Sequence, residues 1–113
     1  MDLKRNFLSL GKKARSGIKL TRPVNLIVIH WIGPYSHPTV YATRTWWENG
    51  TDGTGVPLSA HFVVKREDVL QCLPLDEVGW HTKDERNFRS IGIEVIPMNT
   101  EGSFSQVSIR TII

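Results

Sequence analysis

The sequence predicts an α/β domain with a mixed central β-sheet and helices on its faces. Two apolar, β-branched runs, residues 26–32 and 90–96, have the composition of buried strands. Two further strand-like runs, residues 60–66 and 69–73, follow each other almost directly, and helical patterns flank them. Strands and helices that succeed one another in so short a chain favour helices layered against one sheet.

Length and composition limit the class of protein. At 113 residues the chain has room for one domain, and 40% hydrophobic with 22% charged residues is ordinary for a globular protein. The longest apolar run is far shorter than the roughly 20 residues that cross a bilayer, so we expect no membrane span. Cys72 is the only cysteine, which excludes an intrachain disulfide, and we interpret it as a buried thiol.

The N-terminal segment is strongly basic. Residues 1–22 carry seven Lys and Arg against one Asp, a net charge of +6, and residues 23–113 carry seven against ten, a net charge of −3. We interpret residues 1–22 as a basic leader and residues 23–113 as the domain. Such a segment attracts nucleic acid, anionic lipid or an anionic cell wall, and a solvated leader is an equal alternative. Nucleic acid is the weakest of these, because aromatic residues do not alternate with the basic ones.

The first strand and the first helix have clear boundaries. Residues 26–32 predict a central strand that is buried on both faces. A helix is predicted to start with Ser36 or His37 near its cap and to end at Asn49 and Gly50. Its apolar stripe consists of Val40, Thr43 and Trp47.

The remaining elements follow from turn and capping signals. Residues 51–57 have the composition of a loop, and Glu67-Asp68 separates the two strands of a predicted hairpin, although this turn lacks the usual glycine. Residues 90–96, ended by a proline, predict another buried strand. Ser103 begins a capping box with Gln106, which predicts a helix from that point.

Two buried-strand runs each contain one ionisable side chain, His30 in the first and Glu94 in the second. Burying an unpaired carboxylate costs several kcal/mol, so Glu94 needs a partner, a raised pKa or a position that opens onto a cleft. Satisfaction of each residue by ordinary hydrogen bonds is the simpler alternative. His61 and His81 add a weaker possibility, a three-histidine zinc site with His30, although spacings of 31 and 20 residues match no local metal motif.

Four segments, taken in order and spacing, resemble zinc-dependent N-acetylmuramoyl-L-alanine amidases related to peptidoglycan recognition proteins and phage endolysins. They are Ile-Val-Ile-His-Trp ending at Trp31, Ser-Ala-His-Phe-Val-Val around His61, the stretch from Leu70 to His81, and Arg-Ser-Ile-Gly-Ile-Glu-Val around Glu94. The resemblance covers the chain from about residue 16 to residue 113, and residues 16–20 and 70–75 are most similar to the clostridial and phage type.

The resemblance implies a role for each candidate residue. It assigns His30 as the first zinc ligand and Glu94 as the carboxylate that activates the zinc-bound water. It places Trp80 and His81 in the lining of the substrate groove and leaves His61 structural. The family's other ligands, a His and then a Cys or Asp with a Lys between them, follow the helix that starts at Ser103, so we expect them beyond residue 113.

The resemblance therefore implies a truncated amidase fold and a peptidoglycan hydrolase. The bond cut would be the amide between N-acetylmuramic acid and the L-alanine of the stem peptide. The implied cofactor is zinc, and the implied partner is bacterial cell-wall peptidoglycan, with no nucleic acid. Without a signal-peptide core, we expect synthesis in the cytoplasm and action at the wall after release.

Two further expectations concern activity and geometry. We expect these 113 residues alone to be inactive and to hold zinc weakly. A non-catalytic peptidoglycan-binding module is the alternative function. His30 and Glu94 are expected to face one cleft, with His81 on its rim.

Overall fold

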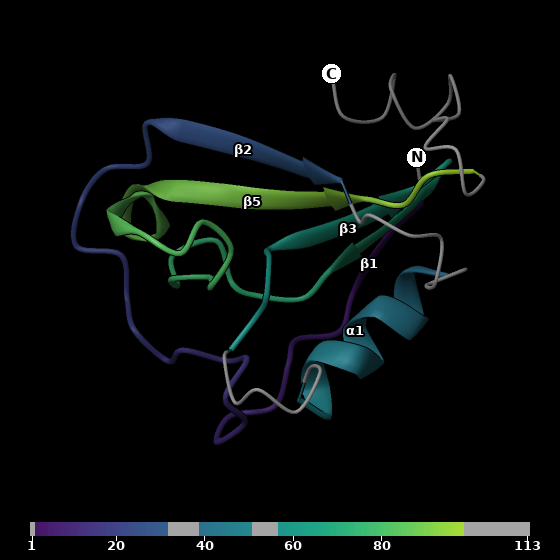
Figure 1. The fold of residues 1–113 in the computed structure, drawn as a ribbon, viewed down its shortest axis with the longest axis horizontal. Helices are drawn as coiled ribbons and strands as arrows, with labels where there is room; N and C mark the ends of the chain where they lie inside the picture. Colours follow the sequence, from purple (N-terminus) through teal and green to yellow (C-terminus); the bar gives the residue numbers. More distant parts are fainter. Residues whose placement is uncertain (1, 32–38, 51–56, 99–113) are drawn as a thin grey trace.

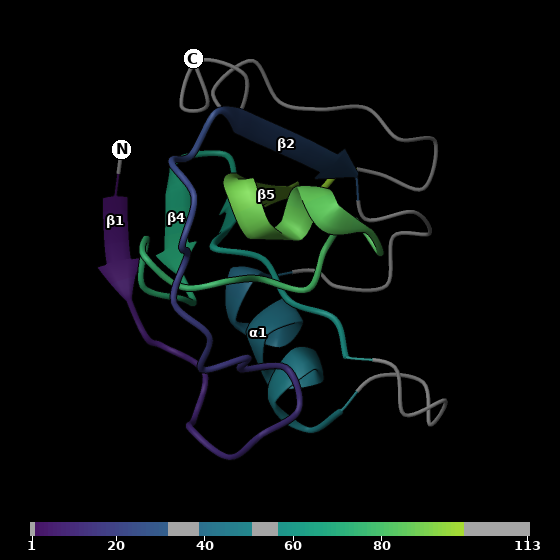
Figure 2. The ribbon, with the colours of Figure 1, turned by 90° about the vertical axis from the view of Figure 1, so that its left-hand side faces the viewer.

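The structure, a computed structural model, describes residues 2–31, 39–50 and 57–98. Its elements are β1 (Asp2–Arg5), β2 (Leu26–Trp31), α1 (Val40–Glu48), β3 (Phe62–Lys65), β4 (Asp68–Gln71), the 3₁₀ helix η1 (Glu85–Arg89) and β5 (Ser90–Val95). The strands form one sheet in the order β1-β4-β3-β5-β2, and α1 lies beneath it (Figures 1 and 2). The predicted α/β class with a mixed sheet is confirmed.

The sheet is mixed because only the β3–β4 pair is antiparallel. The pairs β1–β4, β3–β5 and β5–β2 are all parallel. Register partners project their side chains to the same face, so one row of side chains crosses the whole sheet. The row consists of Lys4, Leu70, Val63, Glu94 and His30.

Helix α1 covers the middle of the face on which this row lies. Its predicted stripe is confirmed, since Val40, Thr43 and Trp47 are buried. Trp47 and Val40 share a hydrophobic core with Val63 and Leu70, which belong to the row. The core therefore fills the middle strands and ends before the row reaches the polar pair at the β5–β2 side.

The boundaries of α1 were partly predicted. The helix begins after Thr39, whose side chain accepts a hydrogen bond of 3.0 Å from the Ala42 N–H. The predicted cap at Ser36 or His37 is wrong, because Thr39 itself is still extended; both predicted residues lie outside the described part of the chain. The predicted end is confirmed, and Gly50 follows it with a φ of 82°, a value that glycine adopts without strain.

The predicted hairpin is confirmed with its turn one residue earlier. β3 ends at Lys65 and β4 begins at Asp68, so Arg66 and Glu67 form the turn. Arg66 has a φ of 54°, which is the left-handed conformation that a short hairpin turn requires. An arginine therefore occupies the position where a glycine would have revealed the turn.

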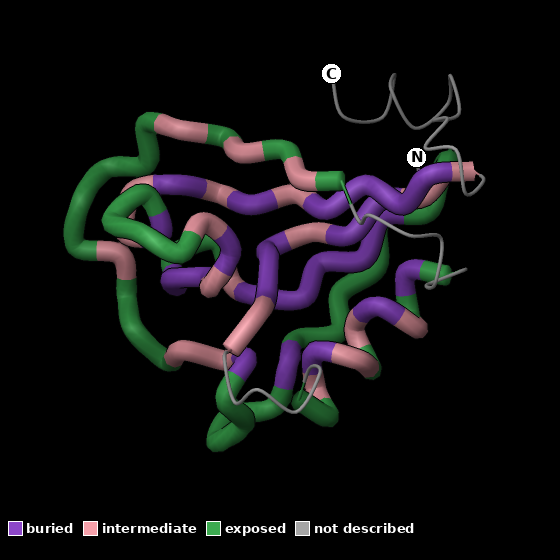
Figure 3. The backbone as a smooth tube through the Cα atoms, viewed as in Figure 1, coloured by how far each residue is buried: buried purple, intermediate pink, exposed green. Residues whose placement is uncertain are grey.

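The prediction of β2 as a central strand buried on both faces is wrong. β2 pairs with β5 and forms the edge of the described sheet, with Ile27, Ile29 and Trp31 exposed at 67%, 56% and 52%. Figure 3 shows β2 as intermediate and exposed where β3 and β5 are largely buried. An apolar β-branched run predicts a strand well, but it does not determine how many strands lie beside it.

The basic N-terminal segment is part of the folded domain rather than a leader separate from it. β1 pairs in parallel with β4, and Leu8 and Ala14 are buried in the hydrophobic core. Arg15 forms a buried ion pair with Glu77, and its Nη2 donates to that carboxylate at 3.1 Å. The predicted separate leader is wrong, because residues between the basic ones, Leu8 and Ala14, contribute to the core.

Two predicted features lie outside the described residues. They are the loop at residues 51–57, except for Pro57, and the helix that starts at Ser103. In the described part of the chain, no helix is long and apolar enough to cross a membrane.

Candidate active site

His30 and Glu94 lie side by side on neighbouring strands. They are register partners in the parallel β2–β5 ladder and therefore project from the same face of the sheet. The expectation that they share one face is confirmed. Their catalytic roles stay predictions.

Glu94 is a buried residue whose carboxylate has no partner among the described residues. Only 8% of the residue is exposed, and within the described residues its carboxylate forms neither a hydrogen bond nor an ion pair. Burial alone raises the pKa of Glu94 to about 7. A carboxylate with this pKa exchanges protons readily near neutral pH, as a general base must.

His81 is buried against His30 and does not lie on the rim of a cleft. It is 7% exposed, its Nδ1 lies 2.8 Å from His30 Nε2, and the two rings meet edge to face with centroids 5.0 Å apart. Its Nε2 lies 3.1 Å from Ser90 Oγ. The predicted rim position is wrong, because a glycine in the sheet allows His81 to pack closely against it and become buried.

That glycine is Gly92, in the middle of β5. A Cβ at Gly92 would lie 2.8 Å from the His81 ring, so only glycine leaves room for the ring to rest on the strand. Asn87 holds the His81 segment from the other side, because its Oδ1 accepts hydrogen bonds from the His81 and Thr82 N–H groups at 3.0 and 2.9 Å. A glycine inside a buried-strand run is a signal of close approach that could have revealed this contact.

His61 is structural, as the resemblance implied. It is fully buried, its Nε2 donates to the Glu77 carbonyl at 2.7 Å, and its Nδ1 accepts from the Gly92 N–H at 3.1 Å. Both ring nitrogens of His61 are thus engaged, as are both of His81. The three-histidine zinc site is therefore wrong, because two of its three rings have no free nitrogen.

Trp80 is half-buried and packs edge to face against Phe88, with ring centroids 6.4 Å apart. Its backbone is fixed to Ser59, whose N–H donates to the Trp80 carbonyl and whose Oγ accepts from the Trp80 N–H. Trp80 therefore lies on a well-anchored segment next to His81. Its predicted place in a substrate groove stays a prediction.

Among the described residues, His30 suits one ligand position of a metal site. Across residues 2–31, 39–50 and 57–98, no three His, Cys, Asp or Glu side chains come close enough to hold a metal ion. His30 still fits a cation, since burial and the charge of Arg86 lower its pKa and keep the ring neutral, as a metal ligand must be. Cys72 does not fit, because burial raises the pKa of its thiol to about 12.

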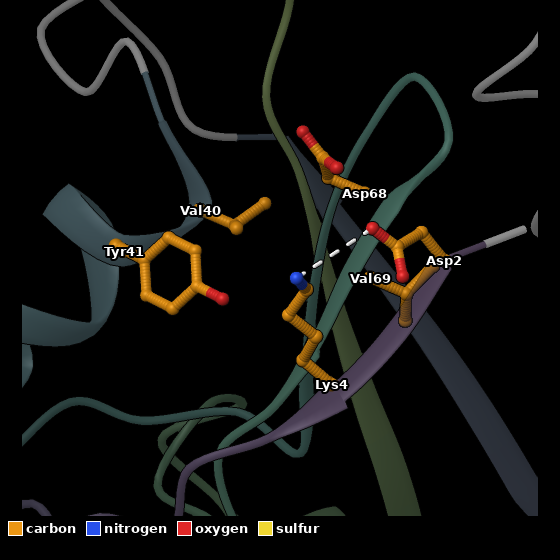
Figure 4. Close-up of a pocket in the computed structure, with 6 residues that line it drawn as sticks. All are labelled: Asp2, Lys4, Val40, Tyr41, Asp68 and Val69. Carbon is orange, nitrogen blue, oxygen red and sulfur yellow. Dashed lines mark ion pairs between the residues drawn. The ribbon is translucent and has the colours of Figure 1, made fainter.

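A pocket of about 70 Å³ lies elsewhere, between β1, β4 and the start of α1 (Figure 4). Asp2, Lys4, Asp68 and Tyr41 provide its polar lining, and Lys4 pairs with Asp2 at 3.8 Å. Both members of this pair are more than half exposed, so the interaction contributes little. The pocket contains neither His30 nor Glu94 and is not the candidate site.

The sequence matches one protein family and a relative within it. The family model described as N-acetylmuramoyl-L-alanine amidase matches residues 20–113. The chain is 29% identical over 111 residues to N-acetylmuramoyl-L-alanine amidase XlyA of Bacillus subtilis (strain 168). The aligned part makes up 96% of this chain and 35% of that protein. The chain thus spans about a third of the length of this relative.

Solved structures share the fold. The catalytic domain of XlyA matches with a TM-score of 0.70 and 28% identity, over 92% of this chain and 66% of that one. PlyL matches with a TM-score of 0.75 over 99% of this chain and 68% of that one, and its 14% identity supports the fold alone.

Proposed function

Because this chain belongs to the N-acetylmuramoyl-L-alanine amidase family, we propose that it contributes the catalytic base of a peptidoglycan amidase. The bond hydrolysed is the amide between the lactyl group of N-acetylmuramic acid and the L-alanine of the stem peptide. The observation that carries this proposal is Glu94, a nine-tenths buried carboxylate with no partner in the described residues, beside His30.

An unpartnered buried carboxylate favours an enzyme over a binding module. Burial of such a group lowers stability whenever it is ionised, so it persists where function needs it. A module that only binds peptidoglycan gains nothing from a carboxylate with a pKa of about 7. A base in that range is near the optimum for taking and returning a proton at neutral pH.

His30 would hold zinc through Nδ1, the ring nitrogen without a hydrogen bond among the described residues, and further ligands are expected from outside them. When bound, zinc supplies an activated water and polarises the scissile carbonyl. Glu94 takes a proton from the attacking water and passes it to the nitrogen of L-alanine. The carbon–nitrogen bond then breaks, which leaves a muramic carboxyl group and a free L-alanine amine.

The remaining functional assignments belong to the same proposal. Trp80 contacts the substrate from its anchored segment beside His81. Bacterial cell-wall peptidoglycan is the partner, reached after release from the cytoplasm in which the chain is made. The net charge of +6 on residues 1–22 supports attraction to an anionic wall, since clustered charge raises the local concentration of an oppositely charged polymer.

The test is zinc-supplemented hydrolysis of purified cell walls by a protein that contains these residues together with the further zinc ligands, followed by the appearance of free L-alanine amino termini. Glu94→Gln is expected to lower the rate by about 10² to 10⁴-fold, the usual contribution of a positioned base. Glu67→Gln, at the exposed β3–β4 turn, is the matched control and should keep the full rate. Hydrolysis that survives Glu94→Gln would refute the assignment. Wall binding without any hydrolysis would favour the non-catalytic module.

A further inference from the structure

A continuous chain of hydrogen bonds links the candidate ligand to the backbone. It runs from the Arg86 carbonyl to Ser90 Oγ at 2.6 Å, from Ser90 Oγ to His81 Nε2 at 3.1 Å, and from His81 Nδ1 to His30 Nε2 at 2.8 Å. Four parts of the fold contribute to it: η1, the segment before η1, and the paired strands β5 and β2. The proposed hydrolysis uses His30 alone among these residues.

The donor and the acceptor of every hydrogen bond in this series follow from the carbonyl at its end. A carbonyl oxygen can only accept, so the single hydroxyl proton of Ser90 must point to Arg86. Ser90 Oγ then accepts from His81, which places the His81 proton on Nε2. A neutral imidazole whose single proton is on Nε2 carries a lone pair on Nδ1, the atom that lies 2.8 Å from His30 Nε2. His30 must donate to that lone pair from Nε2.

We propose that His81 is a positioning residue, which with Ser90 fixes the tautomer and orientation of His30 so that its lone pair remains on Nδ1. This inference rests on the proposed function for its purpose, but the chain of hydrogen bonds exists independently of it. A metal-binding histidine commonly donates its second N–H to an acceptor, which orients the ring and increases its basicity. Here the acceptor is a neutral imidazole rather than a carboxylate.

The surroundings hold His81 rigidly in this role. The ring rests on Gly92, where a Cβ would lie 2.8 Å away, and Asn87 fixes the backbone of His81. A ring that rests on Gly92 and has a partner at each nitrogen cannot turn to exchange its two nitrogens without disturbing β5. The geometry therefore offers His30 one hydrogen-bond acceptor at one fixed position.

The direct test is NMR of the metal-free protein with ¹⁵N-labelled histidine, without substrate. We expect a ¹⁵N–¹⁵N coupling across the hydrogen bond between His30 Nε2 and His81 Nδ1, with the proton attached to His30. Ser90→Ala should weaken or abolish this coupling, because His81 loses the acceptor that selects its tautomer. His61 is the internal control, since its bonds to Glu77 and Gly92 are unaffected.

A proton found on His81 Nδ1 instead, or a coupling unchanged by Ser90→Ala, would overturn the inference. A matched pair then tests the purpose of the contact, because the Oδ1 of His81→Asn can replace Nδ1 as acceptor and His81→Leu cannot. In a protein that also carries the further zinc ligands, competition with a chelator should show zinc affinity about 10 to 100-fold lower for the Leu variant, with partial recovery for Asn. Equal affinities would contradict the positioning role. Neither result depends on amidase activity, so the two proposals can fail separately.

Discussion

Replacement of Glu94 by glutamine is expected to stabilise the metal-free protein at alkaline pH. The carboxyl has a pKa of about 7 in the folded chain and an ordinary value of 4.5 when exposed. Between these values the unfolded carboxyl is ionised while the folded one still holds its proton, so the folded state binds more protons and stability falls as the pH rises. Below pH 4.5 both states are protonated and the residue has no such effect.

The magnitude follows from the same two values. A change from 4.5 to about 7 corresponds to about 3 kcal/mol, lost progressively between these pH values and fully lost above them. Glutamine keeps the shape of the protonated acid and cannot ionise. Glu94→Gln should therefore be close to wild type near pH 5 and more stable by about 2 to 3 kcal/mol at pH 8.

Urea unfolding between pH 5 and 8, followed by tryptophan fluorescence, measures this difference. Burial lowers the pKa of the buried histidines in both proteins alike, so their contributions cancel when the two free energies of unfolding are subtracted. Glu67→Gln, an exposed carboxylate, should show a difference near zero at every pH. A difference for Glu94→Gln that does not change with pH, or a loss of stability at pH 8, would refute the argument that burial controls this group.

Three further predictions test the packing. Arg15→Ala should lower the free energy of unfolding by about 3 to 5 kcal/mol, because it leaves Glu77 buried without its partner. Lys19→Ala, at an exposed ion pair, is the control and should lower the free energy of unfolding by less than about 1 kcal/mol. Equal losses for the two variants would argue against a packed N-terminal segment. Trp47→Ala should cost about 3 to 5 kcal/mol by urea unfolding, and a cost below about 1 kcal/mol would place its side chain outside the core. Cys72 should resist thiol reagents at pH 8 until the chain unfolds, because burial raises its pKa to about 12; rapid modification of the native protein would contradict its burial.

Local patterns predicted the elements but not the arrangement of the sheet's edges. The hairpin, the α1 stripe and both apolar strands could be predicted because each depends on residues close in the chain. The edge position of β2 and the pairing of β1 could not, since both depend on partners more than sixty residues away. Composition alone gave no reason to pair a basic segment with an apolar strand.

The candidate site was likewise predictable only where it depends on local sequence. His30 and Glu94 were accessible to prediction, because an ionisable residue in an apolar strand is conspicuous. The position of His81 was not, since it depends on the missing side chain of Gly92 and on the amide of Asn87. Gly92 signals a close approach to β5 but does not identify the residue that approaches, and Asn87 carries no such signal. The contact forms only when the segment before η1 folds over β5.

The pairing of β1 with β4 also determines how early β1 can join the sheet while the chain is synthesised. Arg5 and its partner Gln71 are 66 residues apart, so at about 5 to 20 residues per second the first strand waits roughly 3 to 13 s for its neighbour. β2 waits a similar time for β5, with which it pairs from Leu26 to Trp31. Until β5 is made, α1, the β3–β4 hairpin and β1 are the elements whose contacts are available. The nascent chain should therefore pair β1 with the β3–β4 hairpin first, and β5 and β2 should complete the sheet last.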